Sequence, residues 1–209
     1  MTDASKALSE ALSAYRPWNA QEEQDVAELR RRLDSGEELW TRENASAHLT
    51  ASAWVVSPDR TKALMCYHRI YNSWSWLGGH ADGETDLLRV ALREVREESG
   101  LTRVRPVTKD LFSVEILTVD GHEKRGRYVS SHLHLNVTYL LEADPDEPLR
   151  VKADENSGLA WFPLDEAVAA STEPWFRQRI YSKLNARLRA LSAPEVPGRG
   201  VDLNPDSTT

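Results

Sequence analysis

The sequence of 209 residues is poor in cysteine and has no long apolar run. Its single cysteine, Cys66, cannot form an internal disulfide, and the apolar run 63–67 around it predicts a buried strand, which is consistent with a reducing compartment. No stretch approaches the roughly 18–20 apolar residues of a membrane span. The polar start of the chain lacks the apolar core of a signal peptide. We therefore expect a cytoplasmic protein with no membrane partner.

Positive charge is outnumbered by negative charge. Lys and Arg number 26 against 33 Asp and Glu, which gives a formal net charge of -7. A chain with this charge has no long-range attraction for nucleic acid, so we expect no nucleic-acid partner. A phosphate-bearing substrate would be repelled at long range as well. Its binding would have to come from a local metal ion and a few arginines.

A cluster of acidic residues follows a glycine-rich loop at 77–83. Beyond the loop, apolar residues recur at the spacing of one buried helix face, namely at Leu88, Ala91, Leu92 and Val95. Thr85 or Asp86 can cap the start of this helix, and Gly100 supplies the left-handed residue that commonly ends one. The pattern predicts a helix that begins just after the loop and ends before Gly100.

Three carboxylates, Glu94, Glu97 and Glu98, stand at i, i+3 and i+4 on the predicted helix and so project from one face. Like charges placed so closely repel each other. Such a cluster is tolerated where the face is solvated, where some carboxylates are protonated, or where a divalent cation neutralises them. The glycine loop favours the cation, because Gly78 and Gly79 permit close approach of the backbone and a carbonyl there can complete a site of oxygen ligands. Oxygen ligands alone indicate Mg²⁺ or Mn²⁺.

Gly79 followed by Arg93-Glu94-Val95-x-Glu97-Glu98-x-Gly100-Leu101 resembles the Nudix box. One position departs from that pattern, since Thr85 occupies the place of an early, mainly structural glutamate and Glu84 lies one residue before it. The resemblance implies a Nudix fold, an α/β/α sandwich around a mixed β-sheet. It also implies that Glu94, Glu97, Glu98 and the carbonyl of Gly79 bind Mg²⁺ or Mn²⁺, that Arg93 pairs with a neighbouring carboxylate, and that Glu98 or Glu155 accepts a proton during catalysis.

The rest of the chain predicts three parts. Residues 1–48 form a helical extension that packs on the core or on a partner subunit, which leaves a homodimer open. Residues 49–191 form the Nudix hydrolase domain, and 192–209 form a disordered tail rich in Pro, Gly, Ser and Asp. Within the domain we expect a hairpin of strands at 50–57 and 62–68, a strand at 107–119 with its partner at 128–141, and a final helix at 175–191.

Substrate contacts are expected from two segments. Arg69 and Tyr71 precede the glycine loop in a stretch dense in aromatic residues, which predicts either core packing or a wall that stacks on a flat substrate group. His132 and His134 share one face of a predicted strand. These histidines either line a cavity wall that touches substrate or satisfy hydrogen bonds within the sheet. A transition-metal site is disfavoured here because no third His or Cys is expected nearby.

The resemblance to the Nudix family, which the carboxylate cluster makes physically sensible, implies a Mg²⁺- or Mn²⁺-dependent hydrolase that cleaves a diphosphate bond in a nucleoside diphosphate linked to another group, with a small nucleotide-type diphosphate as its substrate. A fold that binds nucleotides without catalysis is one alternative, although such a protein is expected to lose box carboxylates and none of the three is lost. An enzyme similar to isopentenyl-diphosphate isomerase is another. That reaction type uses a cysteine and a histidine-rich metal site. The residues around Cys66 do not resemble those around the isomerase cysteine.

Overall fold

A computed structural model describes residues 2–69, 72–124, 126–151 and 156–192 of the chain. Within these ranges an eight-stranded sheet has the order β10-β2-β1-β9-β5, with β3 paired to β2, β4 to β1 and β6 to β9. The elements are, in chain order, α1 Asp3–Ala14, α2 Ala20–Ser35, β1 Ala47–Val56, β2 Lys62–His68, β3 Ser73–Ser75, β4 Leu77–His80, α3 Leu87–Ser99, β5 Arg105–Pro106, β6 Ser113–Val119, β7 His122–Lys124, β8 Arg127–Val129, β9 His132–Glu142, β10 Asn156–Pro163, α4 Leu164–Ala170, the π-helix η1 Phe176–Tyr181 and α5 Ser182–Ser192.

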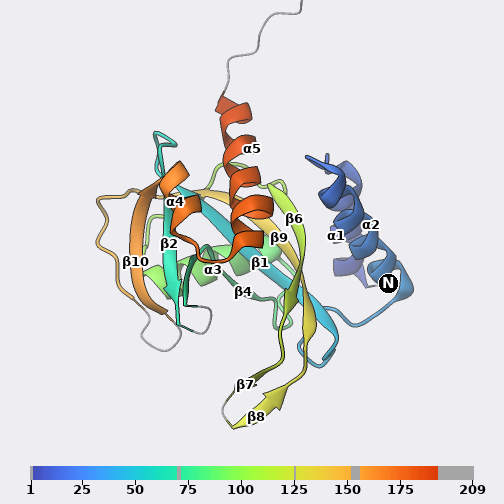
Figure 1. The fold of residues 1–209 in the computed structure, drawn as a ribbon. Helices are drawn as coiled ribbons and strands as arrows, with labels where there is room; N and C mark the ends of the chain where they lie inside the picture. The colour runs from blue at the N-terminus through green and yellow to red at the C-terminus, as the bar shows by residue number, and fades with distance from the viewer. Residues whose placement is uncertain (1, 70–71, 125, 152–155, 193–209) are drawn as a thin grey trace, which may run out of the picture.

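Helices cover both faces of the sheet, with α3 on one side and α4 and α5 on the other (Figure 1). The central strand β1 is buried along its whole length. It runs parallel to β9 and antiparallel to β2 and β4. Alternate residues of β1 therefore enter two separate cores. Leu49, Ala51 and Ala53 pack in the core beneath α3, whereas Trp54 packs in the core beneath α5. The predicted α/β/α sandwich around a mixed sheet is confirmed.

The N-terminal helices pack on the core of this domain, which is one of the two expected arrangements, the other being packing on a partner subunit. Leu12 of α1 and Leu29 and Leu33 of α2 are buried in the same core cluster as Leu49 of β1. Helix α2 starts at the cap Asn19, which accepts a hydrogen bond from the backbone of Glu22. In Figure 1 both helices lie beside β6. Their apolar faces are thus covered within one chain.

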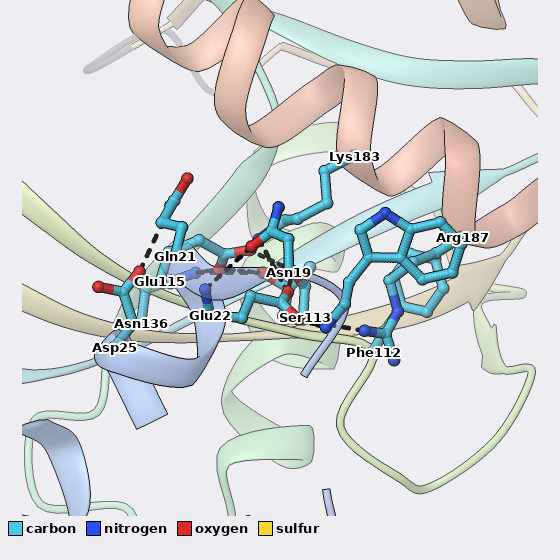
Figure 2. A network of polar contacts seen from close by, with 12 residues as sticks. Asn19, Gln21, Glu22, Asp25, Phe112, Ser113, Glu115, Asn136, Lys183 and Arg187 are labelled. Atoms are coloured by element: carbon cyan, nitrogen blue, oxygen red, sulfur yellow. Dashed lines mark hydrogen bonds and ion pairs between the residues drawn. The ribbon is translucent and has the colours of Figure 1, made fainter. Parts of the chain in front are cut away.

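A buried network of charges joins α2 to the sheet and to α5 (Figure 2). The ammonium of Lys183 lies 2.8 Å from Glu22 Oε1 and 2.9 Å from Glu115 Oε1. Both carboxylates are completely buried. Ser113 contacts both of them, and Arg187 lies 3.2 Å from the second oxygen of Glu22. Two carboxylates therefore face two cations, and the charges balance within the network.

Burial and pairing oppose each other in this network. Burial alone would raise the pKa of Glu22, but the ammonium of Lys183 and several hydrogen bonds outweigh it and hold that pKa below its usual value. Burial alone would lower the pKa of Lys183, and the charges of Glu115 and Glu22 raise it above its usual value instead. Both groups are therefore charged at neutral pH.

The strand expected at 107–119 is interrupted, so that prediction was partly wrong. Val107 donates to Leu140 O at 3.0 Å and Phe112 donates to Thr138 O at 2.8 Å, while the residues between them leave the ladder. Thr108 and Asp110 bond to each other there and form a polar turn. The regular strand β6 starts only at 113, and a separate hairpin of β7 and β8 extends beyond it (Figure 1).

The boundaries of the predicted parts remain predictions. Strand β1 begins at Ala47, two residues before the predicted start of the domain. The tail at 193–209 lies outside the described residues. Within the described ranges, none of the helices combines the length and the apolar character needed to cross a membrane.

Candidate active site

Helix α3 carries the three clustered glutamates and is fixed at both ends. Asp86 caps its start and accepts a hydrogen bond from the backbone N–H of Arg89 at 3.1 Å. Gly100 ends it with a φ of 72°, in the left-handed region, and donates to Arg96 O at 2.9 Å. Val95 is fully buried beneath the sheet. The helix start was expected at Thr85 or Asp86, and the structure selects Asp86.

The two glycines of the loop lie in β4, between β1 and α3. A β-carbon on Gly79 would lie 2.5 Å from Cδ of Glu94, so only glycine leaves room for this carboxylate. The backbone N–H of Gly78 donates to Glu98 Oε2 at 3.1 Å. A side chain on Gly78 would meet the backbone of β1 at 2.7 Å. The carboxylates of Glu94 and Glu98 are therefore held against β4 at Gly78 and Gly79, which have no side chains.

Arg93 connects the helix to the same strand. One guanidinium nitrogen donates to Glu94 Oε1 at 2.7 Å and to the backbone oxygen of His80 at 3.1 Å. A second nitrogen lies 3.9 Å from Glu97 Oε1. The predicted pairing of Arg93 with a neighbouring carboxylate is thus present in the structure. Exposure rises from Glu98, at 7%, to the side chains of Glu94, at 17%, and Glu97, at 48%.

Hydrogen bonds to two further carboxylates hold the loop between β4 and α3 in place. Glu84 Oε1 accepts hydrogen bonds from the backbone N–H groups of Thr85 and Asp86 at 2.9 and 3.1 Å. Asp82 forms two hydrogen bonds of 2.7 Å with Arg42, which precedes β1. Glu84 therefore supports the loop although it lies one residue early in the box pattern.

The residues predicted to contact substrate are only partly placed. Arg69 is exposed just after β2. Tyr71 and the proposed proton acceptor Glu155 lie outside the described residues. His132 and His134 are described, and their surroundings differ from those expected.

Four histidine rings meet on the face of the sheet opposite α3. The ring centroid of His48 lies 4.9 to 5.1 Å from those of His80, His132 and His134. His48, His80 and His134 each offer one ring nitrogen as a possible metal ligand, and these three atoms lie within 4.8 Å of one another. The expectation that no third histidine lies near His132 and His134 was therefore wrong. The parallel pairing of β1 with β9 places His48 opposite His134, and the pairing of β4 with β1 adds His80.

The histidine cluster is poorly solvated. Burial first, and then the neighbouring rings of His80, His48, His132 and His122, lower the pKa of His134 to about 2. Burial likewise lowers the pKa of His48. Both rings are therefore neutral at pH 7.

The chain resembles known proteins in sequence pattern and in fold. The sequence model of the NUDIX domain matches residues 47–184. None of the curated proteins matches the sequence. Similar solved structures include a NUDIX-family hydrolase from Clostridium perfringens, with 19% identity over 69% of this chain and 97% of that one and a TM-score of 0.48. A dihydroneopterin triphosphate pyrophosphohydrolase from E. coli has 15% identity over 70% and 97% of the two chains and a TM-score of 0.48. An Ap4A hydrolase from C. elegans has 16% identity over 69% and 96% and a TM-score of 0.46.

The domain match includes the central strand β1, the glycine strand β4 and the helix α3 that carries the glutamates. Because it extends over more than half of the sequence, the chain belongs to the NUDIX domain family, and the match supports the predicted class of enzyme, a Nudix-type pyrophosphohydrolase.

Proposed function

We propose that this chain is a Mg²⁺- or Mn²⁺-dependent hydrolase that cleaves the diphosphate bond of a nucleoside diphosphate linked to another group. The observation that carries the proposal is the seating of the Glu94 carboxylate against Gly79, with Glu98 hydrogen-bonded to Gly78. Two carboxylates are brought together in a partly buried place although like charges repel, and a divalent cation offsets that repulsion.

The side chains present fit such an ion. Glu94, Glu97 and Glu98 are proposed as its carboxylate ligands, and the Gly79 carbonyl as a further oxygen ligand, which is the hard donor set that Mg²⁺ and Mn²⁺ prefer. When bound, the ion would withdraw charge from phosphorus and orient the diphosphate toward water. The high exposure of Glu97 leaves the outer side of the cluster accessible to a substrate.

The remaining roles follow from the contacts within the cluster. Arg93 is proposed to fix the rotamer of Glu94, because it bonds both that carboxylate and the backbone of β4. Glu98, or Glu155 from the loop before β10, is proposed to accept the proton of the attacking water. The water oxygen bonds to phosphorus while the bridging P–O bond breaks. The products are two phosphate-bearing fragments.

Recognition of the remainder of the substrate is assigned to the sequence-predicted residues. Exposed Arg69 is proposed to contact a phosphate group, and Tyr71 to contact a flat group such as a base. His132, at 8% exposure, and the partly exposed His134 lie on the face of the sheet opposite α3, so their proposed contact would be with a part of the substrate remote from the diphosphate.

One observation favours the isomerase alternative and another disfavours it. A histidine-rich cluster is present, as that reaction type would require. Cys66, however, is buried in the core beneath α3 and its thiol donates to Trp76 O at 3.4 Å. Burial raises the pKa of this thiol, which disfavours the reactive thiolate. Incubation with isopentenyl diphosphate is therefore expected to yield no isomerised product.

Substitution of Gly79 with alanine tests the seating of Glu94. The new β-carbon would lie 2.5 Å from Cδ of Glu94 and must displace the carboxylate. We expect activity at limiting Mg²⁺ to fall by about 10- to 100-fold, the range seen when the support of a metal ligand is lost. Steady-state rates measured over a Mg²⁺ titration should show a raised Mg²⁺ requirement with partial recovery at high Mg²⁺. An unchanged Mg²⁺ dependence would contradict the proposed ligand role of Glu94.

The substrate class is tested with a panel of diphosphates. ADP-ribose, dinucleoside polyphosphates, nucleotide sugars and oxidised nucleoside triphosphates are each incubated with Mg²⁺ or Mn²⁺, and release of phosphate or monophosphate is quantified. We expect hydrolysis of at least one nucleoside diphosphate derivative. Tight binding of a member of the panel without any hydrolysis would instead support the non-catalytic nucleotide sensor.

A further inference from the structure

Four of the six histidines of the chain, His48, His80, His132 and His134, converge on one face of the sheet. They come from β1, β4 and β9, which are remote in sequence, and the fold brings them together through the pairing of β1 with both other strands. We propose that these four rings form a second metal site, which binds a transition-metal ion of the Zn²⁺ class rather than Mg²⁺.

One distance within the cluster equals that of tetrahedral coordination, and the others approach it. Nε2 of His132 lies 3.3 Å from Nε2 of His134. Two imidazole nitrogens bound to one tetrahedral Zn²⁺ at about 2.0–2.1 Å are separated by about 3.3 Å. The ligand atoms of His48, His80 and His134 lie within 4.8 Å of one another, about 1.5 Å wider than that ideal. Small rotations of partly exposed rings can close such a gap.

Hydrogen bonds to the backbone set two of the rings in the form that binds metal. Nδ1 of His48 lies 3.0 Å from Asn44 O, and Nδ1 of His132 lies 2.8 Å from Ser130 O. A carbonyl oxygen only accepts, so Nδ1 carries the proton in both rings and Nε2 presents its lone pair. Metal-bound histidines are commonly oriented by such a contact from the opposite ring nitrogen.

His48 supplies an independent indication of a ligand. The residue is 4% exposed, and its Nε2 is buried with no hydrogen-bond partner among the residues that the structure describes. Burial of an unsatisfied polar atom is unfavourable, so such atoms are rare unless something satisfies them. A metal ion at the centre of the cluster would satisfy this one. The partly exposed rings of His80 and His134 provide the route by which it enters.

The two proposed metal sites lie on opposite sides of β4. Gly79 faces Glu94 on the α3 side, and because side chains alternate along a strand, the ring of His80 lies on the other side. The donors also differ, with carboxylate and carbonyl oxygens at one site and imidazole nitrogens at the other. Imidazole favours Zn²⁺, Co²⁺ and Ni²⁺ over Mg²⁺. The two sites should therefore be filled independently.

The test uses Co²⁺ as a spectroscopic probe on the full, untagged chain. The protein is stripped of metal with a chelator and titrated with Co²⁺ in the presence of excess Mg²⁺, which occupies the carboxylate site. We expect the intense visible absorption of tetrahedral Co²⁺ to saturate at one equivalent. Zn²⁺ should abolish that absorption by displacement, and atomic absorption should then find one retained Zn²⁺ per chain.

Variants distinguish the histidine site from other binding. His48→Ala and His80→Ala should each weaken Co²⁺ binding by at least about 100-fold, more than loss of an outer-shell contact causes. His68→Ala, at the histidine that ends β2, and Glu98→Gln, in the carboxylate cluster, should leave the spectrum unchanged. Circular dichroism establishes that each variant is folded. Absence of a tetrahedral spectrum in the wild-type protein, or its persistence in both folded cluster variants, would overturn the proposal.

Discussion

Glu98→Gln is expected to lower kcat/KM for the best-cleaved diphosphate by about 100- to 1,000-fold, because a metal ligand contributes several kcal/mol to charge stabilisation and each 1.4 kcal/mol is about tenfold in rate. Glutamine keeps the size of the side chain and can still accept the hydrogen bond from Gly78 that Glu98 accepts at 3.1 Å. The substitution therefore removes the negative charge with little change in packing. Initial rates at saturating Mg²⁺ give the measurement.

The matched control for this substitution is Glu23→Gln, at an exposed position of α2. It removes the same charge far along the chain from the glutamate cluster and should leave kcat/KM within about twofold, since surface substitutions away from special features are usually within about 0.5 kcal/mol. Equal activity of Glu98→Gln and the wild-type enzyme on every cleaved substrate would falsify the assignment of Glu98 to the catalytic site.

Lys183→Met is expected to lower the free energy of unfolding by about 3–5 kcal/mol. Methionine preserves much of the aliphatic packing of lysine but removes the ammonium that lies 2.8 and 2.9 Å from two completely buried carboxylates. Among the residues that the structure describes, Arg187, at 3.2 Å from Glu22, would then be the one cation left in ion-pair contact with either carboxylate. Urea unfolding followed by circular dichroism measures the loss.

Two comparisons separate the charge effect from other causes. Lys62→Met, at an exposed position of β2, should change the free energy of unfolding by no more than about 0.5 kcal/mol. Adding Glu22→Gln and Glu115→Gln to Lys183→Met should recover part of the stability, because the uncompensated charges are then removed. A loss below about 1 kcal/mol for Lys183→Met alone would contradict the role given to the buried network, since single removals of a buried partner usually cost more.

The pH dependence of stability follows from the same network. The folded pKa of Glu22 is depressed, so its contribution is present above the unfolded pKa of a glutamate and is lost as the pH falls through the folded value. The folded pKa of Lys183 is raised, so its contribution is present below the unfolded pKa of a lysine and is lost as the pH rises through the folded value. The network thus stabilises the fold across neutral pH.

Local patterns were sufficient to predict the glutamate helix. Its apolar spacing, its capping residue and the closing Gly100 all act within a few residues of one another, and α3 runs from 87 to 99 as they require. The spacing of Glu94, Glu97 and Glu98 likewise places them on one face without reference to the rest of the fold. The contact of Glu94 with Gly79 could be expected only through the family resemblance.

Contacts between distant strands could not be predicted in the same way. His48 meets His134 because β1 pairs in parallel with β9 over a long crossover, and no local spacing encodes that register. A signal was available in part, since His80 directly follows Gly79 and His132 and His134 share one strand face. The burial of Glu22 could not be predicted either, because nothing in the sequence of a highly charged helix indicates which carboxylate will be buried.

The central claim is that a divalent cation held by the glutamates of α3 enables water to cleave a diphosphate. Its most direct test follows hydrolysis of the best-cleaved compound in ¹⁸O-labelled water by ³¹P NMR, with Mg²⁺ and then with excess chelator. We predict one labelled oxygen per cleaved bond, on a phosphate-bearing product, and no cleavage once the metal is removed. Undiminished cleavage in the presence of the chelator, or products that carry no label, would contradict the account.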